Sequence, residues 1–412
     1  GIDSKPSEKH GDAHEKHKDA PGETGIAGNR FFANFTNDDI LNRFFMTLAA
    51  AGLLSCTGTG QSVFDPASVA DASGEVTRVE PLSWWTGMQT PLQLLVNGAG
   101  IAAYDVRIEG GQGVGVKARH KADSPNYLFV DVEVKPDAEP GTYYLVFSQG
   151  ERQFKVPYEI AARAEGSAAR KSFTTADMIY LLMPDRFANG DASNDSTPHT
   201  RERADRSAFF GRHGGDLQGM IDHLDYIAGL GATAVWPTPL LLDDEPEGSY
   251  HGYACGDYYR IDPRFGSNEL YREFVGKAHE HGLKVIMDIV TNHCGTGHWW
   301  MKDLPFRDWI HQFPEYTGTN VCFSTNMDPN ASRYDLDLQE SGWFVPSMPD
   351  MNLDNPYVLQ YFKQWAVWWI EYAGLDGFRV DTYPYNEKVP MSEWCAAVRR
   401  EYSCLLYTSD AA

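Results

Sequence analysis

We predict an α/β fold, the first part of a (β/α)8 TIM barrel, preceded by a small β-sandwich. Residues 75–161 hold short alternating segments that Gly and Pro turns separate, a pattern typical of a sandwich. From residue 172 onward, strand-like segments alternate with helix-like segments, which predicts a parallel sheet with right-handed crossovers. A closed barrel needs eight such units, and residues 172–402 supply about four.

Six segments of the sandwich region have the alternation of strands. They are separated by turns, and the linkers 57–74 and 162–171 bound the domain. The expected strands are VTRVEP (76–81), LQLLVNG (92–98), YDVRIEG (104–110), NYLFVDVEV (126–134), GTYYLVFSQ (141–149) and RQFKVPYEI (152–160).

The barrel region has its own strand and helix signals. We expect strands at 178–182, 233–237, 284–289 and 375–380, and helices at 216–230, 268–281 and 356–372. Within 216–230, the apolar residues Met220, Leu224, Ile227 and Ala228 recur at helical spacing. An inserted loop domain is expected at about 293–355.

The first 56 residues do not resemble either domain. Residues 1–39 are polar and charged, which predicts a disordered leader or one that is not natively translated. Residues 40–56 resemble a bacterial lipoprotein signal, with Arg43 as basic flank, an apolar run, and Leu-Leu-Ser before Cys56. The run is too short to span a bilayer. We expect an exported protein, periplasmic or anchored by lipid at Cys56 in a Gram-negative bacterium; a short buried helix is the alternative.

Charge and cysteine spacing exclude several function classes. Lys and Arg total 35 against 57 Asp and Glu, so the net charge is −22 and nucleic acid is not an expected partner. None of the six cysteines forms a CxxC pair, which disfavours a zinc site or a redox pair. Neutral ligands fit this surface better.

Two polar motifs end the third and fourth expected strands of the barrel. These are Asp288-Ile-Val-Thr-Asn-His293 and Gly377-Phe-Arg-Val-Asp381. Carboxyl ends of parallel barrel strands face the active site, and Arg379 and Asp381 share one face of their strand. A neighbouring cation keeps a carboxylate ionised, which suits a nucleophile that attacks a sugar's anomeric carbon. A structural ion pair at a strand end is the alternative.

These motifs, with Ser249–Tyr259 and Met348–Leu353, resemble conserved segments of the α-amylase family (glycoside hydrolase family 13). The resemblance covers about residues 76–402 and is strongest to the neopullulanase and cyclomaltodextrinase subgroup, which has an N-terminal β-sandwich. It implies retaining hydrolysis of α-glucosidic bonds in maltooligosaccharides, cyclodextrins or pullulan. A transglycosylase and an inactive glucan-binding homologue remain alternatives.

The resemblance also implies roles for individual residues. Asp381 is expected as the nucleophile and Arg379 as its fixed partner. The residues expected at the α-glucan substrate or behind it are His251, Tyr253, Asp288, Asn292 and His293. For the two histidines, a position in the core is the alternative.

Oxygen-bearing residues after the first barrel strand resemble the calcium loop of the same subgroup. The expected ligands of Ca²⁺ are Asn189, Asp191, Asn194, Asp195, Gly214 and Asp216. A turn rich in Asn, Asp and Gly that needs no ion is the alternative. A homodimer is left open.

The end of the chain departs from the family pattern. Members carry a general-acid Glu after a fifth strand, whereas residues 403–412 read SCLLYTSDAA. We therefore expect a non-native tail, no fifth strand, and a C-terminally truncated fragment that is inactive, because a retaining glycosidase needs two carboxyl groups. Open strand edges would favour aggregation.

Overall fold

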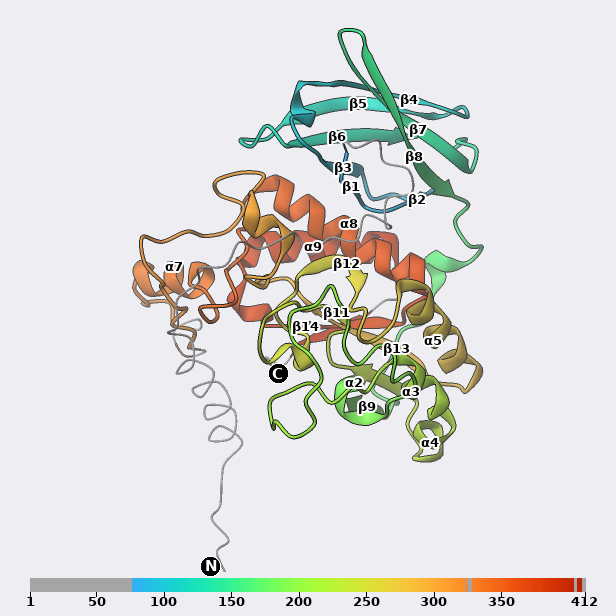
Figure 1. The fold of residues 1–412 in the computed structure, drawn as a ribbon, viewed down its shortest axis with the longest axis vertical. Coiled ribbons are helices and arrows are strands. Elements are labelled where there is room, and N and C mark those ends of the chain that lie inside the picture. The colour runs from blue at the N-terminus through green and yellow to red at the C-terminus, as the bar shows by residue number, and fades with distance from the viewer. Residues whose placement is uncertain (1–75, 323, 325–327, 404–405, 410–412) are drawn as a thin grey trace, which may run out of the picture. The chain divides into compact units, whose positions relative to one another are not determined.

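The computed structural model describes residues 76–322, 324, 328–403 and 406–409, the last of these for the backbone alone (Figure 1). The expectations for 1–39, for 40–56 and for the linker 57–74 lie outside this part of the chain. No helix of the described residues is long and apolar enough to cross a membrane.

Residues 78–161 form the predicted β-sandwich of two four-stranded sheets. The first sheet consists of β1 (Arg78–Glu80), β3 (Leu92–Asn97), β6 (Tyr127–Val134) and β5 (Val114–Lys121), in that spatial order. The second consists of β2 (Trp84–Trp85), β8 (Arg152–Ala161), β7 (Gly141–Gln149) and β4 (Asp105–Glu109). A fold of two such sheets confirms the prediction.

Two strands of the sandwich were not predicted. The sequence of β5, VGVKARHK, alternates half-buried with exposed residues and holds three basic side chains, so it reads as a polar connection. Strand β2 has two residues, which is too short for any periodicity to show.

The second region holds a parallel sheet in the spatial order β15-β14-β13-β10-β9. Its strands are β9 (Ile179–Leu182), β10 (Ala234–Pro237), β13 (Lys284–Val290), β14 (Gly377–Asp381) and β15 (Leu406–Ser409). Its α-helices of the described residues are α2 (Pro184–Phe187), α3 (Leu217–Asp222), α4 (Leu224–Gly229), α5 (Asn268–Glu280), α7 (Arg333–Ser341), α8 (Pro356–Ala373) and α9 (Lys388–Glu401). Strands β11 (Leu241–Leu242) and β12 (Asp257–Ile261) form a separate two-stranded antiparallel sheet.

The expectation that no fifth strand follows β14 was wrong. Strand β15 pairs in parallel with β14, with Gly377 opposite Leu406 and Val380 opposite Ser409. Leu-Tyr-Thr-Ser is a segment of apolar, aromatic and β-branched residues, a composition that fits a pleated sheet. The unpaired edge of β14 offers backbone donors and acceptors to such a segment, whatever its origin.

The single helix expected at 216–230 is two helices. His223 lies between α3 and α4 with φ −118°, outside the helical region. Its Nδ1 lies 2.7 Å from the Gly219 carbonyl oxygen, so the side chain competes for a backbone group of the preceding turn. Met220, Leu224 and Ile227 are nevertheless buried, as the periodicity predicted.

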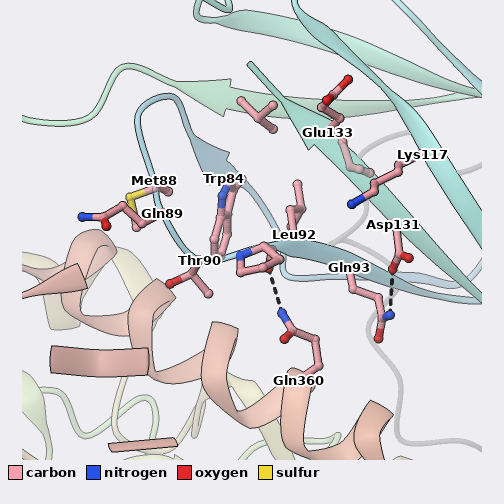
Figure 2. Close-up of a pocket in the computed structure, with 13 residues that line it drawn as sticks. Trp84, Met88, Gln89, Thr90, Leu92, Gln93, Lys117, Asp131, Glu133 and Gln360 are labelled. Atoms are coloured by element: carbon pink, nitrogen blue, oxygen red, sulfur yellow. Dashed lines mark hydrogen bonds between the residues drawn. The ribbon is translucent and has the colours of Figure 1, made fainter. Parts of the chain in front are cut away.

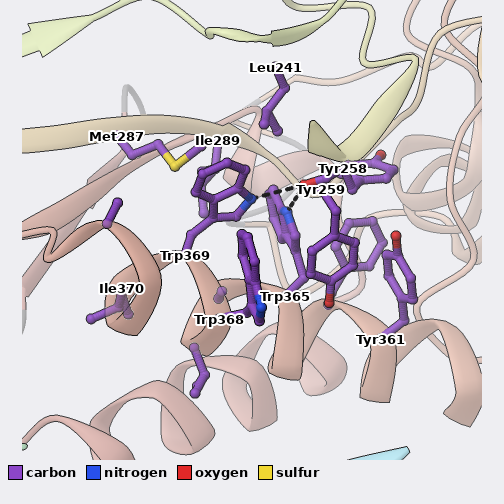
Figure 3. Close-up of a cluster of buried hydrophobic side chains, with 14 of the residues drawn as sticks. Leu241, Tyr258, Tyr259, Met287, Ile289, Tyr361, Trp365, Trp368, Trp369 and Ile370 are labelled. Atoms are coloured by element: carbon purple, nitrogen blue, oxygen red, sulfur yellow. Dashed lines mark hydrogen bonds between the residues drawn. The ribbon is translucent and has the colours of Figure 1, made fainter. Parts of the chain in front are cut away.

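Helix α8 is apolar around most of its circumference because both of its sides are covered. Trp365 and Trp369 each donate from Nε1 to the Tyr258 carbonyl of β12, at 2.5 and 2.9 Å (Figure 3). On the sandwich side, the ring of Tyr357 lies 4.8 Å from that of Phe129 on β6. A helix without a polar face is typical of a fully buried element.

The sandwich and the barrel region share buried polar contacts. Arg78 of β1 pairs with Glu80 and donates to Asp257 of β12 at 2.6 Å. An open pocket is lined by sandwich residues and by Gln360 of α8, which donates to the Pro91 carbonyl at 2.7 Å (Figure 2).

Candidate active site

Arg379 lies between two carboxylates at the carboxyl ends of neighbouring strands. The register of β13 and β14 places Asp288 opposite Arg379 and Val290 opposite Asp381. The Arg379 guanidinium contacts an oxygen of Asp288 at 2.9 Å and an oxygen of Asp381 at 2.8 Å. The side chain of Asp288 is fully buried and that of Asp381 is 12% exposed. Asp381 is therefore the carboxylate that a substrate can reach, and the arrangement is the one predicted.

Asp288 accepts from three donors. Besides Arg379, Trp236 donates from Nε1 at 2.8 Å and Tyr253 from its hydroxyl at 3.1 Å. Burial raises the pKa of Asp288 to about 6, and the three donors oppose this shift. The carboxylate is thus held ionised at neutral pH by the hydrogen bonds around it.

Trp236 is a site residue that the sequence analysis missed. It lies on β10, and the Arg379 guanidinium carbon is 5.1 Å from its ring centroid. Hence one side chain binds Asp288 by a hydrogen bond and Arg379 by a cation–π contact. Its position near the end of the second barrel strand was the available signal, but an aromatic in an apolar strand reads as core.

His251 is the last residue of a short 3-10 turn at Ser249–His251, and Tyr253 follows two residues later. Gly252 has φ 80°, and a Cβ there would lie 2.1 Å from the Pro239 carbonyl oxygen, so only glycine fits. The backbone N–H of Tyr253 donates to His251 Nδ1 at 3.0 Å. Burial lowers the pKa of His251 to about 4. The ring is therefore neutral, and its proton is on Nε2, where it can donate to a sugar hydroxyl.

His293 and Asn292 are fully buried at the end of β13. Asn292 donates from Nδ2 to Asp350 at 2.7 Å, and its Oδ1 lies 3.0 Å from His293 Nδ1. The His293 ring stacks on Phe344 with centroids 5.1 Å apart. Burial lowers the pKa of His293 to about 3, so this imidazole is neutral as well.

The structure brings the fourth predicted motif to the same site. The segment Met348–Leu353 pairs with the end of β13, since Met351 N donates to the Asn292 carbonyl at 2.8 Å. Behind Asn292, Asp350 also contacts His311 Nδ1 at 2.7 Å, and Glu387 lies 3.9 Å from His311 Nε2. Burial raises the pKa of Glu387 to about 8. Asp350 belongs to the predicted motif, whereas Glu387 was not predicted.

The residue after Asp381, the expected nucleophile, has a strained backbone. Thr382 has φ 48°, the single positive φ of a non-glycine residue in the described part of the chain. Such a conformation costs about 1–3 kcal/mol and persists where the surroundings hold it. Asn386 donates to the Thr382 carbonyl at 3.0 Å and contacts Thr291 Oγ1 at 3.1 Å, which ties the loop to the end of β13.

Among the six expected calcium ligands, Asp216 has another role. It begins α3 and accepts from the Gly219 N–H at 2.7 Å. It also accepts from the N–H groups of Gly190 and Asp191, at 3.0 and 2.8 Å, and from Asn194 Nδ2 at 3.3 Å. With these four donors, the carboxylate of Asp216 organises the loop.

The other expected ligands retain oxygen atoms for an ion. Asn189 contacts Asp195 at 2.5 Å, and the space beside Gly214 is so narrow that a Cβ would lie 2.5 Å from Asp195 Oδ1. Asn194 Oδ1 is buried without a hydrogen-bond partner in the described structure. No three His, Cys, Asp or Glu side chains of the described residues could together hold a metal. The donors present are mostly amides and carbonyls, which fit Ca²⁺ rather than a transition metal.

Two family models match the chain. Residues 181–400 match the α-amylase catalytic domain, and residues 78–164 match the N-terminal domain of cyclomaltodextrinase. These two matches cover the barrel region and the sandwich.

Two curated relatives agree with this result. A cyclomaltodextrinase of Thermoanaerobacter pseudethanolicus is 36% identical over 220 residues, which are 51% of this chain and 34% of that protein. Neopullulanase 2 of Thermoactinomyces vulgaris is 36% identical over 225 residues, 51% of this chain and 35% of that protein. The crystal structure of an Anoxybacillus α-amylase superposes with a TM-score of 0.49 at 33% identity, over 57% of this chain and 46% of that one. The matched region spans about a third of the length of these two curated relatives. The site geometry and the matched domains together show that the chain belongs to the α-amylase family and carries a cyclomaltodextrinase-type N-terminal domain.

Proposed function

We propose that the full-length protein hydrolyses α-glucosidic bonds in maltooligosaccharides, cyclodextrins or pullulan with retention of configuration. The observation that carries the proposal is Asp381 at the end of β14, partly exposed and paired with Arg379 at 2.8 Å. An ionised carboxylate at this place is a nucleophile, and the cation behind it stays in the protein when substrate binds.

The chemistry follows from this geometry in two steps. An oxygen of Asp381 forms a bond to the anomeric carbon while the bond to the leaving glycosidic oxygen breaks. A second carboxyl group, about 5–5.5 Å from the first in retaining enzymes, donates a proton to that oxygen. Water, deprotonated by the same group, then releases the sugar from Asp381. The described residues supply the nucleophile, its partner and part of the sugar-binding surface.

Neutral side chains suit a neutral substrate. His251 offers a donor at Nε2, because its Nδ1 is occupied by the Tyr253 N–H. The rings of His251 and Tyr253 lie 5.7 Å apart, and Tyr253 also binds Asp288. An aromatic face therefore adjoins the nucleophile unit, by which we mean Asp288, Arg379 and Asp381. The names of the relatives, cyclomaltodextrinase and neopullulanase, support cyclodextrins and pullulan as substrates.

The test is an assay of the full-length protein on maltoheptaose, β-cyclodextrin and pullulan, with the anomer of the first product followed by NMR. We expect α-anomers to form first. Initial release of β-anomers, or no hydrolysis of any of the three, would refute the proposal.

Calcium is proposed at the loop after β9. Asn189, Asp191, Asn194 and Asp195 would hold it, together with the carbonyl of Gly214. A bound Ca²⁺ there would supply charge neutralisation and rigidity, and no step of the reaction requires it. The unpartnered Asn194 Oδ1 and the crowded Asp195 support this proposal.

Export and lipid attachment at Cys56 are also proposed, on the signal-like composition of residues 40–56. Mass spectrometry of protein made in a Gram-negative host would find Cys56 as the lipid-modified first residue.

A homodimer is proposed as the assembly to test by light scattering.

A further inference from the structure

Residues 202–213 form a loop that backbone hydrogen bonds hold together. Asp205 N donates to the Arg212 carbonyl at 2.9 Å, and Gly211 N donates to the Ala208 carbonyl at 3.1 Å. From outside the loop, Arg186 donates to the carbonyls of Gly211 and Phe209, at 2.8 and 3.1 Å. These contacts hold the backbone at the tip of the loop, and none of them uses the side chain of Phe209.

The tip presents two aromatic rings to solvent. Phe209 is 77% exposed, more than any other large hydrophobic side chain in the described residues, and Phe210 is 39% exposed. The two rings are perpendicular, with centroids 4.8 Å apart. An exposed apolar pair on a rigid support is a feature of binding sites, since folding alone gains nothing from it.

The two ends of this loop contact the turn that carries His251. Glu202 accepts from both the N–H and the hydroxyl of Ser249 at 2.6 Å, and Arg212 donates to the Ser249 carbonyl at 3.0 Å. The charge of Arg212 is close enough to His251 to add to the lowering of its pKa, which burial dominates.

A second contact runs from the tip to the same turn. The guanidinium carbon of Arg186, which holds the Phe209 carbonyl, lies 4.2 Å from the ring centroid of Tyr250. The Tyr250 ring is 5.5 Å from that of His251, and His251 is 5.7 Å from Tyr253, which binds Arg379 and Asp288. A continuous series of contacts thus connects the Phe209 carbonyl to Asp288 and Arg379.

We propose that Phe209 is an outer binding platform for the α-glucan, on which a glucosyl unit remote from the scissile bond stacks its C–H face. This inference rests on the proposed function. The ligand is a neutral sugar because the loop that carries the rings follows β9, at the carboxyl ends of the strands, and contacts the turn that carries His251. Phe210 packs edge-on against Phe209 and fixes the orientation of its ring.

The experiment compares Phe209→Ala in the full-length protein with Tyr226→Ala as control, because Tyr226 is also exposed, at 53%, but lies on α4. Each variant is assayed on maltotriose and on maltoheptaose. For Phe209→Ala we expect kcat/KM on maltoheptaose to fall about tenfold, as for the loss of one stacking contact of about 1.4 kcal/mol. The change on maltotriose should stay within about twofold, and Phe209→Trp should retain the preference for the longer chain. Tyr226→Ala should match the wild type on both substrates.

The outcomes separate the platform from the proposed function. If the wild type hydrolyses both sugars and Phe209→Ala changes neither, or lowers both equally, the platform is wrong while the hydrolase stands. If the wild type hydrolyses no α-glucan, both are wrong. If Phe209→Ala abolishes self-association without changing the length dependence, the rings form a protein contact and the inference is overturned.

Discussion

Arg379 holds the proposed nucleophile, Asp381, together with the buried carboxylate of Asp288, because it contacts both at once. Its guanidinium also lies over Trp236 and Tyr253, at 5.1 and 5.8 Å. A planar cation with a fixed fork can serve four partners where an ammonium group cannot. The unit is therefore rigid before substrate arrives, as electrostatic catalysis requires.

Asp381→Asn should retain the fold and lower kcat by several orders of magnitude, about 10⁴ by analogy with the loss of a catalytic carboxylate. The amide cannot form the covalent bond to the sugar, but it occupies the same volume beside Arg379. Steady-state kinetics and circular dichroism measure the two effects. A variant with more than a tenth of the parental kcat would exclude Asp381 as nucleophile.

Trp236→Phe should shift the acidic limb of the pH–rate profile upward. Trp236 donates to the ionised form of Asp288, whose pKa is about 6, so its loss favours the protonated form and raises that pKa further. Activity, which needs the ionised Asp288 to hold Arg379, then falls at a higher pH than in the wild type.

Trp394→Phe is the matched control, because Trp394 Nε1 donates to the Phe362 carbonyl in the packing of α9 on α8. It should lower stability without moving the pH profile. An identical acidic limb in Trp236→Phe and wild type would show that Trp236 does not act on Asp288.

The sequence was a good guide to residues whose chemistry is polar and whose place is a strand end. Asp288, Arg379 and Asp381 were predicted for this reason and lie together. Trp236 was missed because an apolar residue in an apolar strand carries no signal of a hydrogen bond to a buried carboxylate. Glu387 was missed because its environment comes from His311 and Leu353, which are distant in sequence.

At the scale of elements, strands and helices with strong periodicity were predictable, and local competition decided the others. Helix α5 begins at Asn268 and ends at Glu280, close to the predicted 268–281, because Ser267 caps its first turn. The break at His223 depends on one side-chain contact to a carbonyl, which periodicity does not encode. The pairing of β15 with β14 depends on an available sheet edge as well as on the composition of Leu406–Ser409.

In the loop after β9, the proposed calcium ligand Asn194 and the helix cap Asp216 should respond differently to substitution. Asn194→Ala should abolish the stabilisation that Ca²⁺ gives, because it removes an unpartnered oxygen. Bound ligand raises the free energy of unfolding by about 2.7 kcal/mol at 100-fold excess over Kd. Melting temperatures with Ca²⁺ and with chelator measure this effect.

Asp216→Ala is the comparison, because Asp216 caps α3 and accepts four hydrogen bonds. It should lower the melting temperature with or without the ion. A lost cap costs about 0.5–2 kcal/mol of stability. A wild type whose melting temperature is the same in chelator and in Ca²⁺ would refute the calcium proposal.

At the scale of the whole molecule, buried charges connect the sandwich to the barrel region. Arg78 of β1 is almost fully buried between Glu80 and Asp257, and Tyr361 of α8 donates to Glu80 at 2.8 Å. Glu401 of α9 accepts from the N–H groups of Gln89 and Thr90, at 2.9 and 2.8 Å. Asp257 and Glu401, two buried acids of the barrel region, thus gain a cation and two N–H donors from the sandwich.

Arg78→Met should therefore destabilise the protein strongly. It leaves two buried acids without their cation, and breaking a buried pair in this way costs about 3–5 kcal/mol. Arg107→Met removes an exposed pair with Glu109 and should cost less than about 1 kcal/mol. Denaturant unfolding measures both, and equal effects of the two substitutions would show that the buried contact does not join the regions.

The central claim is that Asp381 forms the covalent bond to the sugar. The most direct measurement incubates the full-length protein with a fluorinated α-glucosyl fluoride that accumulates the glycosyl-enzyme, and then maps the modified peptide by mass spectrometry. We predict a single sugar attached to Asp381 in the segment Gly377–Asp381, and no label in Asp381→Asn. A label on another carboxylate of an active enzyme would contradict the account.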